Sequence, residues 1–236
     1  MTCYAGSNSI QAETIAGLGR IRLEHTPRRI LIADDHAVVR KGIIEILKAA
    51  PHIQVDGEVE SGTELLKLLR SGEWDAVIMD LRMPGVSGLD LMKRVRRLKP
   101  DTPVLILTVE PEDIYARRLL QAGASGYLTK DTVATELITA VEKVCNGGRF
   151  VSEAFAEQLV FTMDAASDKP LHERLSDREF EVLRLLSSGM TPTAIADKLC
   201  LSVKTVSTHR KRILEKMGMR TNADLMKYAI QNGLVE

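Results

Sequence analysis

The sequence predicts a doubly wound α/β domain with a five-stranded parallel sheet, followed by an all-α domain of four helices that includes a helix-turn-helix. Three observations lead to this prediction. Short apolar runs alternate with helical patterns five times between residues 28 and 150. These runs are apolar throughout, as expected for parallel strands that helices cover on both faces. After residue 170 the chain holds helical patterns that begin at N-cap residues.

Each predicted strand precedes one amphipathic stretch. The strands are predicted at residues 29–33, 55–59, 76–79, 104–107 and 126–128. The helices are predicted at residues 38–50, 61–72, 87–99, 112–122 and 132–146. Because crossovers between parallel strands are right-handed, five such units form a doubly wound sheet.

Composition divides the chain into four parts. Residues 1–27 are weakly patterned and are predicted to be an N-terminal extension. Residues 28–150 form the α/β domain, residues 151–170 a linker, and residues 171–236 the helical domain.

Charge is unevenly distributed along the chain. The 236 residues have a formal net charge of zero, yet residues 202–216 carry five Lys and Arg against one Glu. A local basic stretch favours contact with nucleic acid. Cys3, Cys145 and Cys200 are too far apart for a disulfide framework or a zinc motif. The sequence has no signal-peptide pattern and no apolar run long enough to span a bilayer, so we expect a cytoplasmic protein without membrane contact.

Five polar residues stand where predicted strands end. These residues are Asp34, Asp35, Asp80, Thr108 and Lys130. Since ligands of open α/β sheets bind outside the carboxyl ends of the strands, we expect these side chains to meet in one crevice. Three clustered carboxylates need a cation, and Mg²⁺ prefers such oxygen ligands. A carboxylate there can accept a phosphoryl group.

Residues 28–150 resemble the receiver domain of two-component response regulators, with its flavodoxin-like fold. The motif residues are the Asp34-Asp35 pair, the segment 79–85 around Asp80, Thr108, Tyr127 and Lys130. The resemblance implies that Asp80 is the phosphoacceptor and that Asp34 and Asp35 hold Mg²⁺ together with it and the backbone carbonyl of Arg82. It further implies that Thr108 and Lys130 bind the phosphoryl group and that Tyr127 is a switch aromatic. Asp131 departs from the family, where Pro often follows the lysine.

The stretch 203–217 is predicted to be the helix that reads DNA. On a helical wheel its apolar residues Val203, Val206, Ile213, Leu214 and Met217 share one arc, which Arg210 also enters. The opposite side is basic and hydroxylic, with Lys204, Thr208, Lys211 and Arg212 facing outward and Ser207 at the flank. Such side chains suit base edges and phosphates of a major groove.

Residues 171–236 resemble the LuxR-type helix-turn-helix domain, so the whole chain resembles the NarL/FixJ class of response regulators. The motif residues lie at 175–179, 195–196 and 202–209. The resemblance implies base contacts from Ser207, Thr208 and Lys211, and phosphate contacts from Lys204, Thr205 and Arg212. His209 is either a packed structural histidine or a DNA contact. Thr191-Pro192 departs from the family, which usually places Asn and Lys or Glu there.

The resemblance implies a transcription regulator that is not an enzyme, apart from at most slow self-phosphorylation and self-dephosphorylation. Its expected partners are double-stranded DNA, a sensor histidine kinase, RNA polymerase and, when phosphorylated, a second copy in a homodimer. The main alternative is a phosphorylation-independent DNA-binding regulator whose receiver serves dimerisation or protein contact. A phosphohydrolase is disfavoured because Arg82 stands where such enzymes place a second aspartate.

Overall fold

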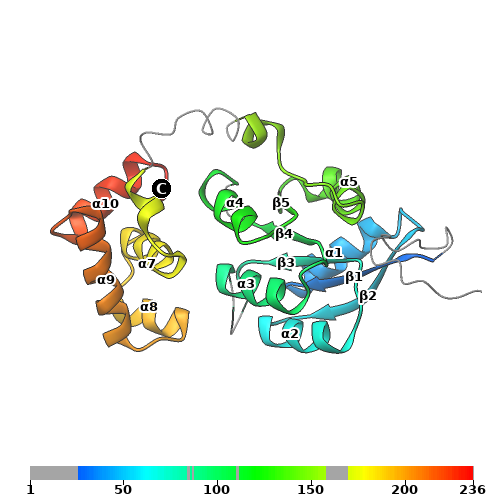
Figure 1. Ribbon diagram of the computed structural model, residues 1–236, viewed down its shortest axis with the longest axis horizontal. Coiled ribbons are helices and arrows are strands. Elements are labelled where there is room, and N and C mark those ends of the chain that lie inside the picture. The colour runs from blue at the N-terminus through cyan, green and yellow to red at the C-terminus, as the bar shows by residue number, and fades with distance from the viewer. Residues whose placement is uncertain (1–25, 84–85, 87, 110–111, 158–169, 236) are drawn as a thin grey trace, which may run out of the picture.

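The computed structural model describes residues 26–83, 86, 88–109, 112–157 and 170–235. The N-terminal extension, up to residue 25, and the linker residues 158–169 lie outside this description. The chain forms an α/β domain and a helical domain that lie side by side (Figure 1). None of the helices in the described ranges is long and apolar enough to cross a membrane.

The α/β domain contains five parallel strands, as predicted. Their bounds are Arg28–Ala33 (β1), Ile53–Val59 (β2), Ala76–Asp80 (β3), Val104–Thr108 (β4) and Gly126–Thr129 (β5). The strands lie in the order β2-β1-β3-β4-β5, so the strand order reverses next to β1. The carboxyl ends of β1 and β3 are therefore neighbours, and the switch point of the sheet lies between them.

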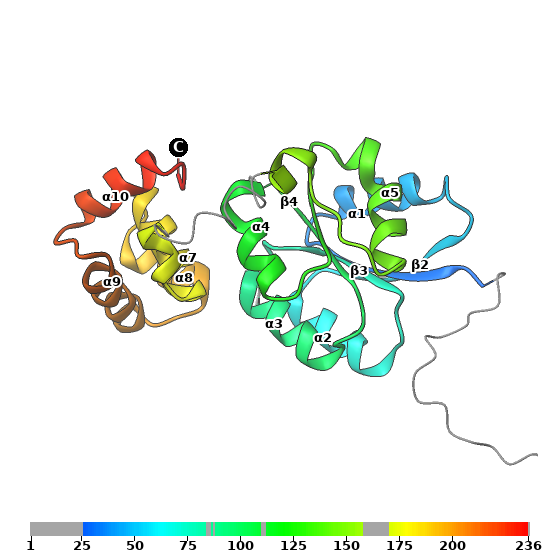
Figure 2. The same ribbon diagram turned by 45° about the horizontal axis from the view of Figure 1, so that its top comes forward.

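Helices cover both faces of the sheet. Their bounds are Ala37–Leu47 (α1), Gly62–Ser71 (α2), Gly88–Leu98 (α3), Glu112–Gln121 (α4) and Val133–Cys145 (α5). Helices α1 and α5 lie on one face, and α2 and α3 lie on the other (Figures 1 and 2). Each face of the sheet has its own hydrophobic core, and successive residues of β1 point into opposite cores. Leu31 packs among α2 and α3 residues, and Ile32 packs among α1 and α5 residues. Burial on both faces explains why the strands are apolar throughout.

The helical domain has one short 3-10 helix and four α-helices. Their bounds are Leu171–Arg174 (η1), Asp177–Ser187 (α7), Pro192–Leu199 (α8), Val203–Met217 (α9) and Asn222–Gln231 (α10). The N-caps form as predicted, since the hydroxyls of Ser176, Thr191 and Ser202 each accept a backbone N–H of their own helix. Cys200, in the turn between α8 and α9, has a φ of 51° and is the one non-glycine residue with positive φ in the described ranges. This left-handed residue sets the angle at which α9 leaves α8.

Two details differ from the sequence expectations. A helical turn at 153–157 occupies part of the predicted linker, and its Phe155 packs into the core of the α/β domain. Val203 was expected on the core face of α9 but is 44% exposed. It is the first residue of the helix.

Candidate functional site

Three of the five predicted side chains meet at the carboxyl ends of β1, β3 and β5. Asp34 directly follows β1, Asp80 is the last residue of β3, and Lys130 directly follows β5. The ammonium of Lys130 lies 2.6 Å from Asp34 Oδ2 and 2.8 Å from Asp80 Oδ2. Both carboxylates are almost fully buried, whereas Asp35 is exposed. Any two of these three residues are at least 46 positions apart in the sequence. The strand order brings their side chains together.

Burial and charge act in opposite directions on the ammonium. Partial burial of Lys130 lowers the pKa of this group, while the hydrogen bonds and charges of Asp34 and Asp80 raise it by more, so that the net pKa is raised. Lys130 is therefore a cation that offsets part of the negative charge in the crevice.

Four potential metal-ligating residues cluster here. The ligand atoms of Asp34, Asp35, His36 and Asp80 all lie within 4.8 Å of one another. His36 Nδ1 is 2.8 Å from Asp35 Oδ1, and the His36 backbone N–H donates to Asp34 Oδ1 at 2.8 Å. The sequence interpretation did not include His36 among the site residues. The sequence could have indicated His36, because it directly follows Asp34 and Asp35.

The other residues predicted for the pocket are Thr108, Tyr127 and Arg82, which lie on or next to strands β3, β4 and β5. Thr108 ends β4 and is fully buried. Tyr127, in β5, is 1% exposed and packs with the α3 and α4 residues. The backbone N–H of Arg82 donates to Asp80 Oδ1 at 3.2 Å, while the Arg82 side chain is exposed. The roles predicted for these three residues remain predictions.

The outward face of α9 is open to solvent. Its exposed residues are Lys204, Ser207, Thr208, Lys211 and Arg212. The sequence placed all of them on this face. Thr205 is half-buried, and its hydroxyl lies 2.7 Å from the Ser202 hydroxyl, so it belongs to the N-cap of the helix.

Residues behind α9 hold it in place, and the sequence interpretation did not find them. Glu179 on α7 is 3% exposed; it accepts the Ser176 N–H and lies 2.6 Å from Lys216 Nζ. Burial raises the pKa of Glu179, but these hydrogen bonds and the Lys216 charge outweigh it, and the net pKa is lowered. Arg210, unexplained by the wheel, donates from Nε to Asn222 Oδ1 of α10 at 2.6 Å. Two polar contacts thus fix α9 to α7 and α10.

His209 faces the interior of the helical domain. It is half-buried, and its Nδ1 is buried with no hydrogen-bond partner within the described ranges. The pKa of His209 is lowered, mainly by burial. The charge of Glu179 raises this pKa, and the charges of Arg178 and Arg212 lower it further. A neutral, packed histidine fits this position.

The fold and its sites define a two-domain regulator: an α/β domain with an acidic pocket at the switch point of its sheet, joined to a helix-turn-helix domain. Family models agree with each half. Residues 30–142 match the response regulator receiver domain, and residues 173–229 match the luxR family of bacterial regulatory proteins.

Similar proteins extend this match over most of the chain. The response regulator GacA of Pseudomonas protegens is 41% identical over 88% of this chain and 98% of its own length. The response regulator UvrY of Escherichia coli K12 is 32% identical over 87% of this chain and 94% of its own. The response regulator RcsB of Salmonella typhimurium, in a structure at 30% identity, covers 86% of this chain and 96% of its own with a TM-score of 0.66. RcsB bound to the promoter rprA with the phosphomimetic BeF3− covers 85% and 98%, also at 30% identity, with a TM-score of 0.61.

The chain therefore belongs to the two-component response regulators of the NarL/FixJ class, with a receiver domain and a LuxR-type DNA-binding domain.

Proposed function

We propose that Asp80 accepts a phosphoryl group from the phosphohistidine of a sensor histidine kinase, and that this transfer controls sequence-specific DNA binding and transcription in the cytoplasm. One observation carries the proposal. The carboxylate of Asp80 lies within hydrogen-bond reach of Lys130 and among the acidic residues that follow β1. A carboxylate in such surroundings can accept a phosphoryl group while the cation beside it offsets the negative charge of that group.

Phosphoryl transfer to Asp80 exchanges a phosphorus–nitrogen bond for a phosphorus–oxygen bond. A carboxylate oxygen of Asp80 forms a bond to phosphorus while the bond from phosphorus to the histidine nitrogen breaks. The electron pair of the broken bond stays on the imidazole, which takes up a proton. Lys130 would bind one phosphoryl oxygen, because its ammonium already faces Asp80, and the Thr108 hydroxyl would bind another.

The residues at the crevice fit a magnesium ion. Asp34, Asp35 and Asp80 supply carboxylate oxygens, which are hard ligands, and the exposed side of Asp35 leaves room for coordinating water. Asp34, Asp35, Asp80 and the Arg82 carbonyl would hold the ion. When bound, Mg²⁺ neutralises charge on the phosphoryl oxygens.

The open face of α9 would contact double-stranded DNA. Ser207, Thr208 and Lys211 would meet bases, while Lys204, Thr205 and Arg212 would meet phosphates. The similar protein RcsB has been solved in complexes with DNA, which supports this use of the domain. Two copies on paired half-sites, and contact with RNA polymerase, complete the proposed function.

A labelling experiment tests the phosphoacceptor. Wild-type protein and Asp80→Asn are incubated with labelled acetyl phosphate and Mg²⁺, and acid-stable counts are measured. Wild type is expected to take up label and the variant none; stoichiometric label on the variant would refute the assignment. Footprints on genomic DNA with and without phosphodonor then test control. Identical footprints would favour the alternative, a DNA-binding regulator whose binding does not depend on phosphorylation.

A further inference from the structure

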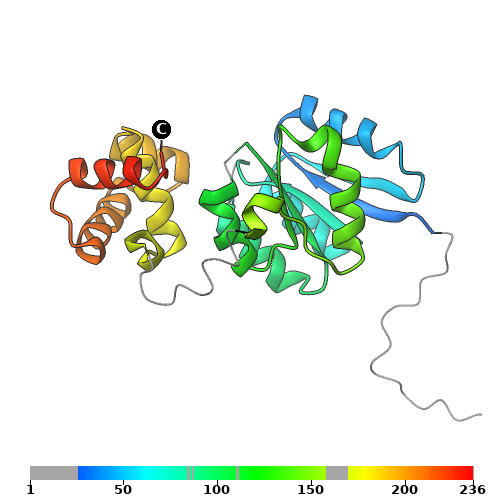
Figure 3. The ribbon, with the colours of Figure 1, turned by 90° about the horizontal axis from the view of Figure 1, so that it is seen from above.

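Arg40 on helix α1 lies directly behind the acidic pocket. Helix α1 lies beside β1 and the edge strand β2 (Figure 3). The Arg40 side chain is only 9% exposed, although it carries a permanent positive charge. A buried charge needs partners of opposite charge or strong hydrogen-bond acceptors. The partners of Arg40 therefore indicate what its burial does for the fold and for the pocket.

The guanidinium of Arg40 joins the end of β1 to the end of β2. Its Nη1 donates to the backbone carbonyl of Asp34 at 2.6 Å, and its Nη2 donates to Glu60 Oε1. Its Nε lies 3.5 Å from Glu58 Oε2, which is an ion pair without a hydrogen bond. Because the guanidinium is planar and presents its donors in fixed directions, these contacts together determine where the Asp34 carbonyl lies.

The carbonyl that Arg40 holds belongs to the peptide between the two adjacent acidic residues, Asp34 and Asp35. The backbone N–H of Asp34 donates to the Val59 carbonyl of β2 at 3.2 Å. Both backbone polar groups of Asp34 are therefore bound, one by β2 itself and the other by Arg40. Since a peptide unit is planar, the direction of its carbonyl fixes the orientation of the whole unit. That orientation determines where the chain places Asp35.

Asp35 depends on this support more than Asp34 does. The buried carboxylate of Asp34 has Lys130 Nζ at 2.6 Å and the His36 N–H at 2.8 Å. The carboxylate of Asp35 is 32% exposed and contacts the ring of His36, which is itself exposed. Surrounding side chains therefore hold the Asp34 carboxylate in place, whereas the backbone decides where the Asp35 carboxylate lies.

The charge of Arg40 and its hydrogen bond to the backbone affect metal binding in opposite directions. A cation near the pocket repels Mg²⁺, so removal of the charge alone would strengthen metal binding. Glu58 and Glu60, which are 46% and 67% exposed, already offset part of this charge. Removal of the hydrogen bond to Asp34 would weaken metal binding, because the two carboxylates would lose their fixed arrangement. The sign of the change in metal affinity therefore distinguishes the two effects.

We propose that Arg40 is a positioning residue of the acidic pocket: it holds the peptide between Asp34 and Asp35 against β2 and thereby sets the affinity for the metal ion, although it is not a metal ligand. The inference rests on the proposed function, in which Asp34 and Asp35 hold Mg²⁺ beside Asp80. Residues that orient metal ligands commonly control metal affinity by about 10- to 100-fold. Arg40 therefore acts on phosphoryl uptake through the affinity for metal.

The first test measures metal binding without a phosphodonor. Mn²⁺ serves as the probe, because electron paramagnetic resonance separates free from bound ion, and full-length wild type is compared with Arg40→Gln and Arg40→Lys. We expect the dissociation constant to rise about 10-fold in Arg40→Gln and about 3-fold or more in Arg40→Lys, because lysine keeps the charge but not the fork of donors. A dissociation constant that falls, or stays within about twofold of wild type, in both variants would overturn the proposal.

A pair of surface variants keeps the test decisive if urea unfolding shows that the Arg40 variants do not fold. Glu60→Ala removes the hydrogen-bonded anchor of Arg40, and Glu58→Ala removes an equal charge that lies near Nε without a hydrogen bond. Glu60→Ala should raise the Mn²⁺ dissociation constant at least about twofold more than Glu58→Ala does. Equal values for this pair would overturn the proposal. Lys41→Ala, which removes the exposed cation next to Arg40, should leave the dissociation constant unchanged.

The second test separates metal binding from phosphoryl transfer. At limiting Mg²⁺, Arg40→Gln should take up label from acetyl phosphate about 10-fold more slowly than wild type, and at saturating Mg²⁺ the two rates should agree within about threefold. A slow rate that persists at saturating metal contradicts the proposal, because it would mean that Arg40 acts on the transfer step.

The two tests also distinguish this inference from the proposed function. Wild type that takes up no label at Asp80 would refute the phosphoacceptor assignment, whereas the Mn²⁺ measurements would still decide the role of Arg40. Wild type that binds no Mn²⁺ would overturn both the magnesium assignment and the role of Arg40. Metal binding by wild type that is unchanged in the Arg40 variants would overturn the role of Arg40 alone.

Discussion

The acidic pocket, where Asp80 is the proposed phosphoacceptor, and the outward face of α9, the proposed DNA-reading face, use the same kinds of charged residue in opposite surroundings. Asp34, Asp80 and Lys130 are buried or half-buried and contact one another. Lys204, Lys211 and Arg212 are exposed on one helix. Lys211 Nζ lies 3.8 Å from Glu215 Oε1, which is a long ion pair. The pocket side chains are therefore already held by one another, whereas in the proposed function the outward face of α9 would gain most of its interactions from DNA.

Removal of divalent metal gives the largest expected difference between the two regions. With excess EDTA, labelling of Asp80 by acetyl phosphate should fall by about 100-fold or more, because the pocket carboxylates and the phosphoryl oxygens repel each other without the ion. Half-site DNA binding by the unphosphorylated protein should be unchanged, since α9 needs no metal. Added Mg²⁺ should restore labelling. Full labelling in EDTA would contradict the magnesium assignment.

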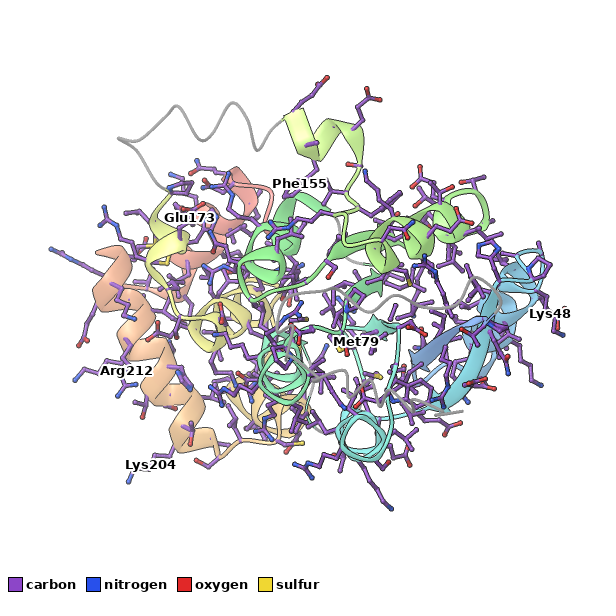
Figure 4. The ribbon with its side chains drawn as sticks, turned by 45° about the vertical axis from the view of Figure 1, so that its right-hand side comes forward. Lys48, Met79, Phe155, Glu173, Lys204 and Arg212 are labelled. Atoms are coloured by element: carbon purple, nitrogen blue, oxygen red, sulfur yellow. The ribbon has the colours of Figure 1, made fainter. Side chains whose placement is uncertain are left out.

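Lys211→Ala should affect only the DNA-reading face. We expect operator binding to weaken by about 1–3 kcal/mol and the slope of log affinity against log salt to become shallower by up to about one charge. Lys48→Ala is the matched control, because Lys48 is an exposed lysine on the far side of the receiver (Figure 4). Equal operator binding by the two variants would show that Lys211 does not contact the DNA. Labelling of Asp80 should be the same in both.

Glu179→Gln tests the support behind α9. Loss of the charged pair with Lys216 should reduce the free energy of unfolding by about 1–3 kcal/mol at pH 7. Because the pKa of Glu179 is lowered in the folded state, its stabilisation is present above the ordinary carboxylate pKa and is lost as the pH falls through the folded pKa.

Urea unfolding at pH 7 and at pH 3 measures this effect. The difference between wild type and Glu179→Gln should be larger at pH 7 than at pH 3. Glu215→Gln, an exposed carboxylate on α9, should change stability by less than about 0.5 kcal/mol. A Glu179→Gln difference that is the same at both pH values would show that its charge does not support α9.

The smallest expected effect concerns the turn before α9. Cys200 is in the left-handed region at φ 51°, which costs a residue with a Cβ about 1 kcal/mol more than glycine. Glycine loses more backbone entropy on folding, which offsets part of this gain. Cys200→Gly should therefore stabilise the protein by about 0.5 kcal/mol in urea unfolding. Destabilisation would mean that the thiol makes a contact that the turn depends on.

Sequence order was sufficient to predict the fold class and the acidic residues and lysine of the pocket, but not His36. Asp34, Asp80 and Lys130 follow apolar strands, and parallel strands of a doubly wound sheet bring their carboxyl ends to one edge. The outward row of α9 was equally predictable, because helical periodicity alone separates Lys204 and Lys211 from Val206. In both cases a local repeat and a rule of topology determine where a side chain points.

Tertiary structure alone decided which distant residues touch. Nothing in the sequence pairs Arg118 with the carbonyls of His172 and Leu175, Glu179 with Lys216, or Arg210 with Asn222. These contacts join separate elements or separate domains, and their formation depends on helix packing distances that no periodic pattern encodes. The sequence by itself determined the two domains and their chemistry, while the packing between elements determined how the domains meet and left α9 open, because contacts between surfaces depend on shape as well as on residue type.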